Sequence, residues 1–154
     1  MKLITCNKKI VFKSKFGNIQ IIGVEEKITS LDFTKSNLQT SNSNFLNKAK
    51  KQIEEYILGR RYKFSLKLNL IGTEFQLKVW KQLQLIPYGE TYSYLKLAKI
   101  LNTSPRAIGN ACGKNPILII IPCHRIIAVN GSLSGFSALG GIKTKKRLLQ
   151  NENL

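Results

Sequence analysis

Hydrophobic and polar positions alternate differently in the two halves of the chain. Residues 9–12 and 19–25 have the short apolar pattern of β-strands and are separated by the turn residues Gly17 and Asn18. A polar, Ser- and Asn-rich stretch follows. Apolar residues over 44–58 then recur at helical spacing, with Gly59 placed to end the helix. The first part therefore predicts a small α/β scaffold.

The second part predicts a series of short helices. Thr73 and Gln76 have the spacing of a capping box, which predicts a helix to about residue 84. Another apolar pattern predicts a helix over 93–101. Ser104 as N-cap and Pro105 in the first turn predict a third helix to about residue 113. Two short helices joined by a tight turn form a helix-turn-helix pattern, so the third helix is the candidate DNA-contacting element.

The remaining segments are shorter and carry a candidate nucleophile. The apolar run over 117–121 predicts a buried strand, which Cys123 and His124 follow directly. Asn130-Gly131 predicts a two-residue hairpin turn, and residues 135–141 a loop of small residues. A last helix is expected over 142–150, with its basic residues on exposed faces: Lys143, Lys145, Lys146 and Arg147.

Charge is the most unusual bulk property. The chain of 154 residues has 25 Lys and Arg against 8 Asp and Glu, a formal net charge of +17. Such a field attracts polyanions such as nucleic acid, although an abundance of Lys, Asn and Ile is also what an AT-rich genome produces. The 43% of hydrophobic residues is enough for a packed core.

The numbers of cysteine and histidine residues argue against a disulfide-stabilised protein and against a zinc protein. The three widely spaced cysteines, Cys6, Cys112 and Cys123, argue against a disulfide framework and for a reducing compartment. With one histidine, a zinc site is not expected. No segment has the length of a membrane span or the pattern of a signal peptide, so we expect a cytoplasmic protein.

Cysteine reacts as the thiolate, and a nearby imidazole is a common acceptor for its proton. Cys123 beside His124 therefore indicates nucleophilic chemistry, although a Cys-His pair alone is more often structural. Successive side chains of an extended segment point to opposite sides, so we expect a bridging water or a bend at Pro122 to mediate proton transfer.

The order of motifs from Gly72 to Glu152 resembles the 6-O-alkylguanine-DNA alkyltransferases, also called methylated-DNA–protein-cysteine methyltransferases. The resemblance is carried by Gly72-Thr73-Glu74-Phe75-Gln76, Val79-Trp80, Ser93-Tyr94, Arg106-Ala107-Ile108-Gly109, Asn115-Pro116 and Pro122-Cys123-His124-Arg125. It implies an α+β fold, with a small N-terminal α/β domain over 1–70. A mostly helical, winged-helix-like DNA-binding and active-site domain would follow over 71–154.

The resemblance also implies DNA repair, by irreversible transfer of an alkyl group from the 6-oxygen of guanine, and from the 4-oxygen of thymine, to Cys123. A monomer acting on double-stranded DNA without a cofactor is implied. By resemblance, His124 is the base, Glu152 orients it and Asn115 is a hinge. Further roles are implied for residues that contact DNA (Arg106, Tyr94, Ala107 and Gly109) and for residues that contact the base (Tyr94, Ile126 and Ser137).

Two departures from the family's usual spacing concern the substrate site. The segment between Tyr94 and Arg106 is about two residues shorter than is usual in the family. The loop over 136–141 is about two residues longer than usual, and it has Phe136 where tyrosine is common. Two alternatives remain at this point: a lesion-binding protein of the alkyltransferase-like kind, which lacks the cysteine, and a Cys-His hydrolase acting through a thioester.

Overall fold

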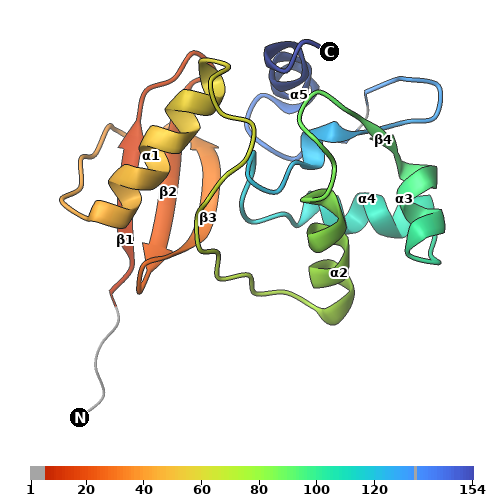
Figure 1. The fold of residues 1–154 in the computed structure, drawn as a ribbon, viewed down its shortest axis with the longest axis horizontal. Helices are drawn as coiled ribbons and strands as arrows, with labels where there is room; N and C mark the ends of the chain where they lie inside the picture. The colour runs from red at the N-terminus through yellow and green to blue at the C-terminus, as the bar shows by residue number, and fades with distance from the viewer. Residues whose placement is uncertain (1–5, 134) are drawn as a thin grey trace. The chain divides into compact units, whose positions relative to one another are not determined.

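The computed structural model describes residues 6–133 and 135–154, and the chain divides into two compact units, Met1–Leu70 and Ile71–Leu154. The first unit contains an antiparallel sheet in the order β1-β2-β3, formed by β1 (Lys8–Phe12), β2 (Asn18–Val24) and β3 (Lys27–Thr34). Helix α1 (Asn44–Ile57) packs on β1 and β2 and lies across one face of this sheet (Figure 1).

The core of the first unit lies between α1 and the sheet. Strand β2 buries every second residue, including Ile19 and Ile21, as expected for a sheet with one covered face. Gly23 continues this buried row. Only glycine fits here without rearrangement, because a Cβ at this position would collide with the Phe45 ring of α1. Gly59 has a φ of +75° just after α1, which confirms the predicted helix end.

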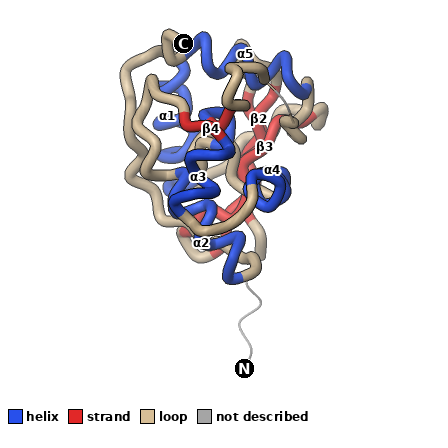
Figure 2. The backbone as a smooth tube through the Cα atoms, turned by 90° about the vertical axis from the view of Figure 1, so that its right-hand side faces the viewer, coloured by secondary structure: helices blue, strands red, loops and turns tan. Residues whose placement is uncertain are grey.

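In its described residues, 71–133 and 135–154, the second unit contains four α-helices and one small parallel strand pairing. The helices are α2 (Glu74–Leu83), α3 (Tyr94–Ile100), α4 (Pro105–Gly113) and α5 (Gly141–Asn151). Strand β4 (Tyr92–Ser93) pairs in parallel with β5 (Ile126–Ile127) and runs directly into α3 (Figure 2). A single 3-10 turn, η1 (Cys123–Arg125), precedes β5.

Local sequence signals place three of these helices. The predicted capping box of Thr73 and Gln76 is present at α2, and Ser93 and Ser104 accept hydrogen bonds from the first turns of α3 and α4. Trp80 of α2 is 1% exposed, and its indole N–H donates to the Ala111 carbonyl of α4 at 2.9 Å. The helix-turn-helix pair of α3 and α4 is therefore fixed against α2.

The predicted strand over 117–121 is wrong. This run is buried, but it folds as consecutive turns in which the Ile121 N–H donates to the Ile117 carbonyl and Ile119 has a φ of +70°. An apolar run predicts burial, whereas its length alone does not separate a strand from a buried turn. Cys123 consequently lies on a helical turn, and the expectation of extended backbone at Cys123-His124 is also wrong.

The hairpin predicted at Asn130-Gly131 is only partly present. The turn forms, with Gly131 at a φ of +82° and its N–H donating to the Ala128 carbonyl. Across this turn the Ala128 N–H donates to the Ser132 carbonyl at 3.1 Å, while the strand before it, β5, pairs with β4.

Candidate active site

The Cys123 side chain lies at the start of η1 and is 5% exposed. The side-chain amide of Asn115, just after α4, donates to the Cys123 sulfur at 3.1 Å and to the Ile121 carbonyl at 2.8 Å. The amide oxygen of the same Asn115 accepts from the Ile117 N–H at 2.9 Å. One side chain therefore connects the end of α4, the buried turn and the sulfur.

A buried ion-pair network lies next to this sulfur. His124 Nε2 lies 2.6 Å from one carboxylate oxygen of Glu152, and Arg125 donates to both oxygens of this carboxylate, at 2.8 and 3.2 Å. Arg125 also donates to the Ile86 carbonyl at 2.7 Å. All three ionisable residues are nearly inaccessible, with exposed fractions of 0%, 5% and 1% for His124, Arg125 and Glu152.

The end of the chain is held in place around Glu152. The Gly89 N–H donates to the Glu152 carboxylate at 3.1 Å, and the Tyr88 hydroxyl donates to the Asn151 carbonyl at 3.1 Å. Buried charges persist when they are paired and hydrogen-bonded, as this carboxylate is. Although Glu152 is two residues from the C-terminus, its side chain is therefore part of the core of the second unit.

Electrostatics keep the imidazole ready to accept a proton. Burial lowers the pKa of His124 from its ordinary value of 6.5, and the charges of Arg125 and Lys145 add to this; the hydrogen bond with Glu152 acts in the opposite direction. The neutral imidazole is therefore favoured near pH 7. Because Nε2 faces the carboxylate, Nδ1 is the nitrogen that would exchange the thiol proton.

Lys145 is placed differently from the sequence prediction. It was expected on an exposed face of the last helix with Lys143, Lys146 and Arg147, but its side chain is 0% exposed. The helix turns Thr144 and Lys145 inward together with Leu148 and Leu149, so this one basic residue lies in the core. Its Nζ is 3.5 Å from the Tyr94 hydroxyl.

The predicted DNA-contacting residues lie on α3 and α4. Tyr94, Arg106 and Gly109 line a pocket of about 640 Å³ together with Ala128 and Gly135. Arg106 is exposed in the first turn of α4. The structure therefore brings three of the four predicted DNA contacts to one pocket.

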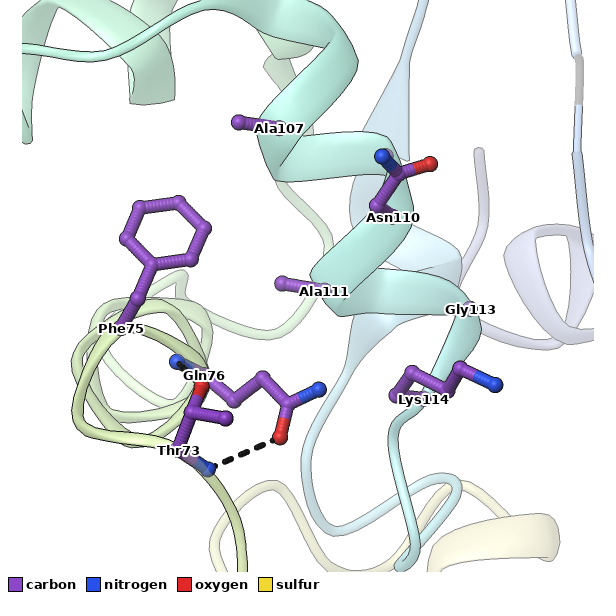
Figure 3. Close-up of a pocket in the computed structure, with 9 residues that line it drawn as sticks. Thr73, Phe75, Gln76, Ala107, Asn110, Ala111, Gly113 and Lys114 are labelled. Carbon is purple, nitrogen blue, oxygen red and sulfur yellow. Dashed lines mark hydrogen bonds between the residues drawn. The ribbon is translucent and has the colours of Figure 1, made fainter.

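A second pocket, of about 660 Å³, is lined by residues of α2 and α4 (Figure 3). The ring of Phe75 from α2 faces α4 here, while Asn110 and Lys114 extend from α4. Ala107, the fourth predicted DNA contact, lines this pocket, and Gly109 lines both. Asn110 of α4 likewise lines both pockets.

The two other predicted base contacts are separated by burial. Ile126 is fully buried in β5, whereas Ser137 is exposed and its hydroxyl donates to the Gly113 carbonyl at 3.2 Å.

The described residues contain no group of three or more His, Cys, Asp and Glu side chains that could hold a metal ion. Within the same part of the chain, no helix combines the length and apolar character needed to cross a bilayer.

Arg125 and Lys145 are the site residues that sequence reasoning did not identify. Arg125 stood in the quoted motif without a role, and the only available signal was its position after the Cys-His pair. For Lys145, the signal was the helical spacing of its neighbours Leu148 and Leu149, which places it near the apolar stripe.

The helix-turn-helix pair and the buried cysteine beside a histidine–carboxylate pair define a class of DNA-directed proteins with a nucleophilic thiol. Two family descriptions match nearly the whole chain: the ribonuclease-like domain of 6-O-methylguanine DNA methyltransferase over residues 7–70 and its DNA binding domain over 74–154. The chain belongs to the 6-O-methylguanine DNA methyltransferase family.

Individual relatives agree with this assignment. A methylated-DNA–protein-cysteine methyltransferase of Methanosarcina acetivorans is 39% identical over 151 residues, which cover 92% of this chain and 96% of the relative. The crystal structure of the Mycobacterium tuberculosis O6-methylguanine methyltransferase is 35% identical, with a TM-score of 0.85 over 96% of this chain and 93% of that one. The M. tuberculosis OGT in complex with DNA is 38% identical, with a TM-score of 0.81 over 92% and 90%.

Proposed function

We propose that this chain repairs DNA by moving an alkyl group from the 6-oxygen of guanine in a duplex to the sulfur of Cys123. The 4-oxygen of thymine is expected to be a second substrate atom. The observation that carries the proposal is the placement of the Cys123 sulfur, which accepts a hydrogen bond from Asn115 and lies on the same turn as His124, the partner of the Glu152 carboxylate.

The reaction follows from the residue types. Neutral His124 accepts the thiol proton through a bridging water, and Glu152 stabilises the resulting cation. The thiolate attacks the alkyl carbon, the bond from this carbon to the guanine oxygen breaks, and the electron pair stays on the purine. The product is a thioether, which water does not cleave. Each chain therefore acts once.

The reacting carbon is hidden inside a duplex, so the nucleotide has to rotate into a pocket. Arg106 would fill the vacated space, and Tyr94 would contact the rotated base, because both line the pocket beside α4. Ala107 and Gly109 keep the helix surface small for close approach to DNA, Ile126 and Ser137 are proposed base contacts, and Asn115 is the proposed hinge. We expect a monomer located in the cytoplasm.

Intact mass after mixing with a duplex that contains 6-O-methylguanine tests the proposal. We expect a gain of one methyl group per chain, located on Cys123 by peptide mapping and never exceeding one equivalent. Cys123→Ala should bind the duplex without gaining mass, and Cys6→Ala, which removes an exposed cysteine, should react like the wild type. Repeated turnover, or a methyl group on Cys6 or Cys112, would overturn the mechanism.

The same experiment separates the two alternatives. A lesion-binding protein would bind the methylated duplex and leave its methyl group in place, but such proteins lack the cysteine that is present here as Cys123. A thioester hydrolase would turn over acyl substrates and would not need an exposed arginine on a helix-turn-helix.

A further inference from the structure

The pocket between α2 and α4, called here the Phe75 pocket, has no part in the transfer reaction proposed above. It has a volume of about 660 Å³, and all the residues that line it belong to the second unit. From α2 it is lined by an aromatic ring and an amide (Figure 3). From α4 it is lined by small side chains, a second amide and the ammonium group of Lys114. This combination suits a ligand that is flat, partly polar and negatively charged.

The aromatic surface is the ring of Phe75, which faces α4 and is 36% exposed. Most of the residues that line the pocket from α4 are small, namely Ala107, Gly109, Ala111 and Gly113. A Cβ added at Gly113 would meet no atom within 4 Å, so the space in front of this end of α4 is open. A flat ring can therefore lie against Phe75. Stacking on aromatic side chains is a general way in which proteins hold the bases of nucleic acids.

Gln76 presents a hydrogen-bond donor to this pocket in a fixed orientation. Its amide oxygen accepts from the Thr73 N–H at 3.0 Å, while its backbone N–H donates to the Thr73 hydroxyl at 3.1 Å. The capping box thereby commits the oxygen to α2, and the NH₂ group is the part of the amide that remains for a ligand. Figure 3 shows this side chain extending from α2 toward α4. An NH₂ group matches a carbonyl oxygen, which cytosine and thymine both carry.

The Phe75 pocket adjoins the pocket proposed for the rotated nucleotide. Arg106 and Asn110, one turn apart on α4, line the pocket for the nucleotide. Ala107, Ala111 and Lys114 form the next stripe of the same helix and line the Phe75 pocket, which Asn110 borders as well. Lys114 is exposed and can contact a phosphate. DNA that places a nucleotide in the first pocket therefore passes close to the second.

We propose that the Phe75 pocket is a second base-binding site, which takes the pyrimidine left without a partner when the alkylated guanine rotates out of the duplex. Rotation unpairs two bases, the guanine and the base opposite it, so the reaction itself supplies this ligand. Phe75 stacks on the pyrimidine, Gln76 donates to its carbonyl oxygen and Lys114 contacts its phosphate. Holding the pyrimidine prevents the guanine from pairing again before Cys123 reacts. This inference rests on the proposed function.

Duplexes that differ only opposite the lesion test this site. One duplex has cytosine opposite 6-O-methylguanine, and the other has an abasic sugar there, which keeps the phosphates and removes the base. Affinities are measured for Cys123→Ala, which cannot react, and for the same chain with Phe75→Ala added. The control is Leu77→Ala in the same background, because Leu77 of α2 is also 36% exposed and does not line the pocket.

We expect Phe75→Ala to weaken binding of the cytosine duplex at least about fivefold, the lower end of what stacking one base on an aromatic ring contributes. Binding of the abasic duplex should not change, because that duplex has no base to stack. Phe75→Trp, which keeps an aromatic face, and Leu77→Ala should bind both duplexes as the parent chain does. Equal weakening of both duplexes by Phe75→Ala, or weakening of neither, would overturn the proposal.

Gln76→Glu tests the amide without changing Phe75. Glutamate keeps an oxygen for the Thr73 N–H, so the capping box is retained, but it has no NH₂ group. Its negative charge repels the phosphates of both duplexes alike, so the additional loss with the cytosine duplex measures the missing donor. This variant decides the matter if Phe75→Ala does not fold, as judged by thermal unfolding, and an equal loss with both duplexes would then overturn the proposal.

Failure of the proposed function would give a different result. In that case the wild type would gain no methyl group on Cys123, as measured by intact mass. The binding comparison uses a chain that cannot react, so it tests the Phe75 pocket separately from the transfer.

Discussion

At the scale of single residues, the site depends on how the buried Glu152 carboxylate is stabilised. Arg125 contributes two hydrogen bonds to it, His124 one contact and the Gly89 N–H another. Arg125 thus keeps a negative charge in the core while His124 stays neutral. The Cys-His-carboxylate arrangement is consequently supported by a fourth residue.

Removing Arg125 should therefore unfold the protein more easily. Arg125→Ala leaves the Glu152 carboxylate buried with much less compensation, and breaking a buried pair in this way costs about 3 kcal/mol or more. The measurement is urea unfolding, compared with Arg60→Ala, which removes an arginine that is exposed. An equal, small effect of both variants would show that Arg125 is dispensable for stability.

His124 should make stability depend on pH. Its pKa is lowered in the folded protein, so the unfolded chain takes up a proton near pH 6.5 that the folded chain does not. Its contribution is fully present above about pH 6.5 and is lost as the pH falls toward the folded pKa, by up to about 1.4 kcal/mol per pH unit. Urea unfolding of wild type and His124→Gln at pH 7.5 and 5.5 measures this. A stability difference that did not shrink at pH 5.5 would contradict the lowered pKa.

Asn115 is the residue whose substitution should affect the sulfur most directly. Asn115→Asp keeps a side-chain oxygen that can accept from the Ile117 N–H. It replaces the NH₂ group that donates to the Cys123 sulfur with a carboxylate oxygen, which carries negative charge and cannot donate. We expect iodoacetamide to react with Cys123 at least about tenfold more slowly at pH 7, since one tenfold step is about 1.4 kcal/mol. Asn110→Asp, on an exposed position of α4, is the control, and equal rates would remove Asn115 from the site.

Residue-level prediction from the sequence was limited to what motifs and spacing show. Cys123, His124 and Glu152 were expected as site residues by resemblance, and the structure places His124 and Glu152, which are 28 positions apart in the chain, in contact. The burial of Lys145 follows from the way α5 packs. The basic composition of this helix gives no sign of that burial. A run of lysines predicts a solvated face, and one member of the run is an exception.

At the scale of elements, helices with side-chain caps were predictable. Thr73, Ser93 and Ser104 mark helix starts through hydrogen bonds that are local in sequence. Strand β3 was not predicted, because its hairpin turn is Glu25-Glu26 with both residues at positive φ, where Asn-Gly is the usual signal. Non-local packing also decides that residues 117–121 form turns.

The position of Arg106 in the first turn of α4 gives a prediction for this helix. If Arg106 fills the space of the rotated nucleotide, Arg106→Ala should slow repair of 6-O-methylguanine in a duplex by roughly ten- to a hundredfold, because unstacking costs a few kcal/mol. Reaction with free 6-O-benzylguanine needs no rotation and should barely change. Lys99→Ala on α3 is the control for loss of an exposed charge. Equal slowing of both substrates by Arg106→Ala would make Arg106 structural.

At the scale of the whole molecule, both units are strongly basic. The unit over 1–70 has fourteen Lys and Arg against five Asp and Glu, and the unit over 71–154 has eleven against three. Of the eleven, Arg125 and Lys145 are buried in the site. The helix-turn-helix lies in the second unit, so it does not explain the positive charge of the first unit. That charge has two possible origins: contact with DNA, or the lysine-rich composition that an AT-rich genome produces.

Salt dependence separates these two origins of the charge. Each phosphate contact contributes about 0.9 to the slope of log affinity against log salt, so binding should weaken at least tenfold between 50 and 200 mM salt with as few as two contacts. We expect Lys99→Gln with Lys114→Gln, next to the recognition helix α4, to lower this slope by about 1 to 2. The matched pair Lys13→Gln and Lys27→Gln, exposed in the first unit, removes the same charge and should leave the slope unchanged. The measurement is titration of Cys123→Ala with an unmodified duplex. If the second pair lowered the slope as much as the first, the first unit would contact DNA, and its charge would be functional rather than compositional.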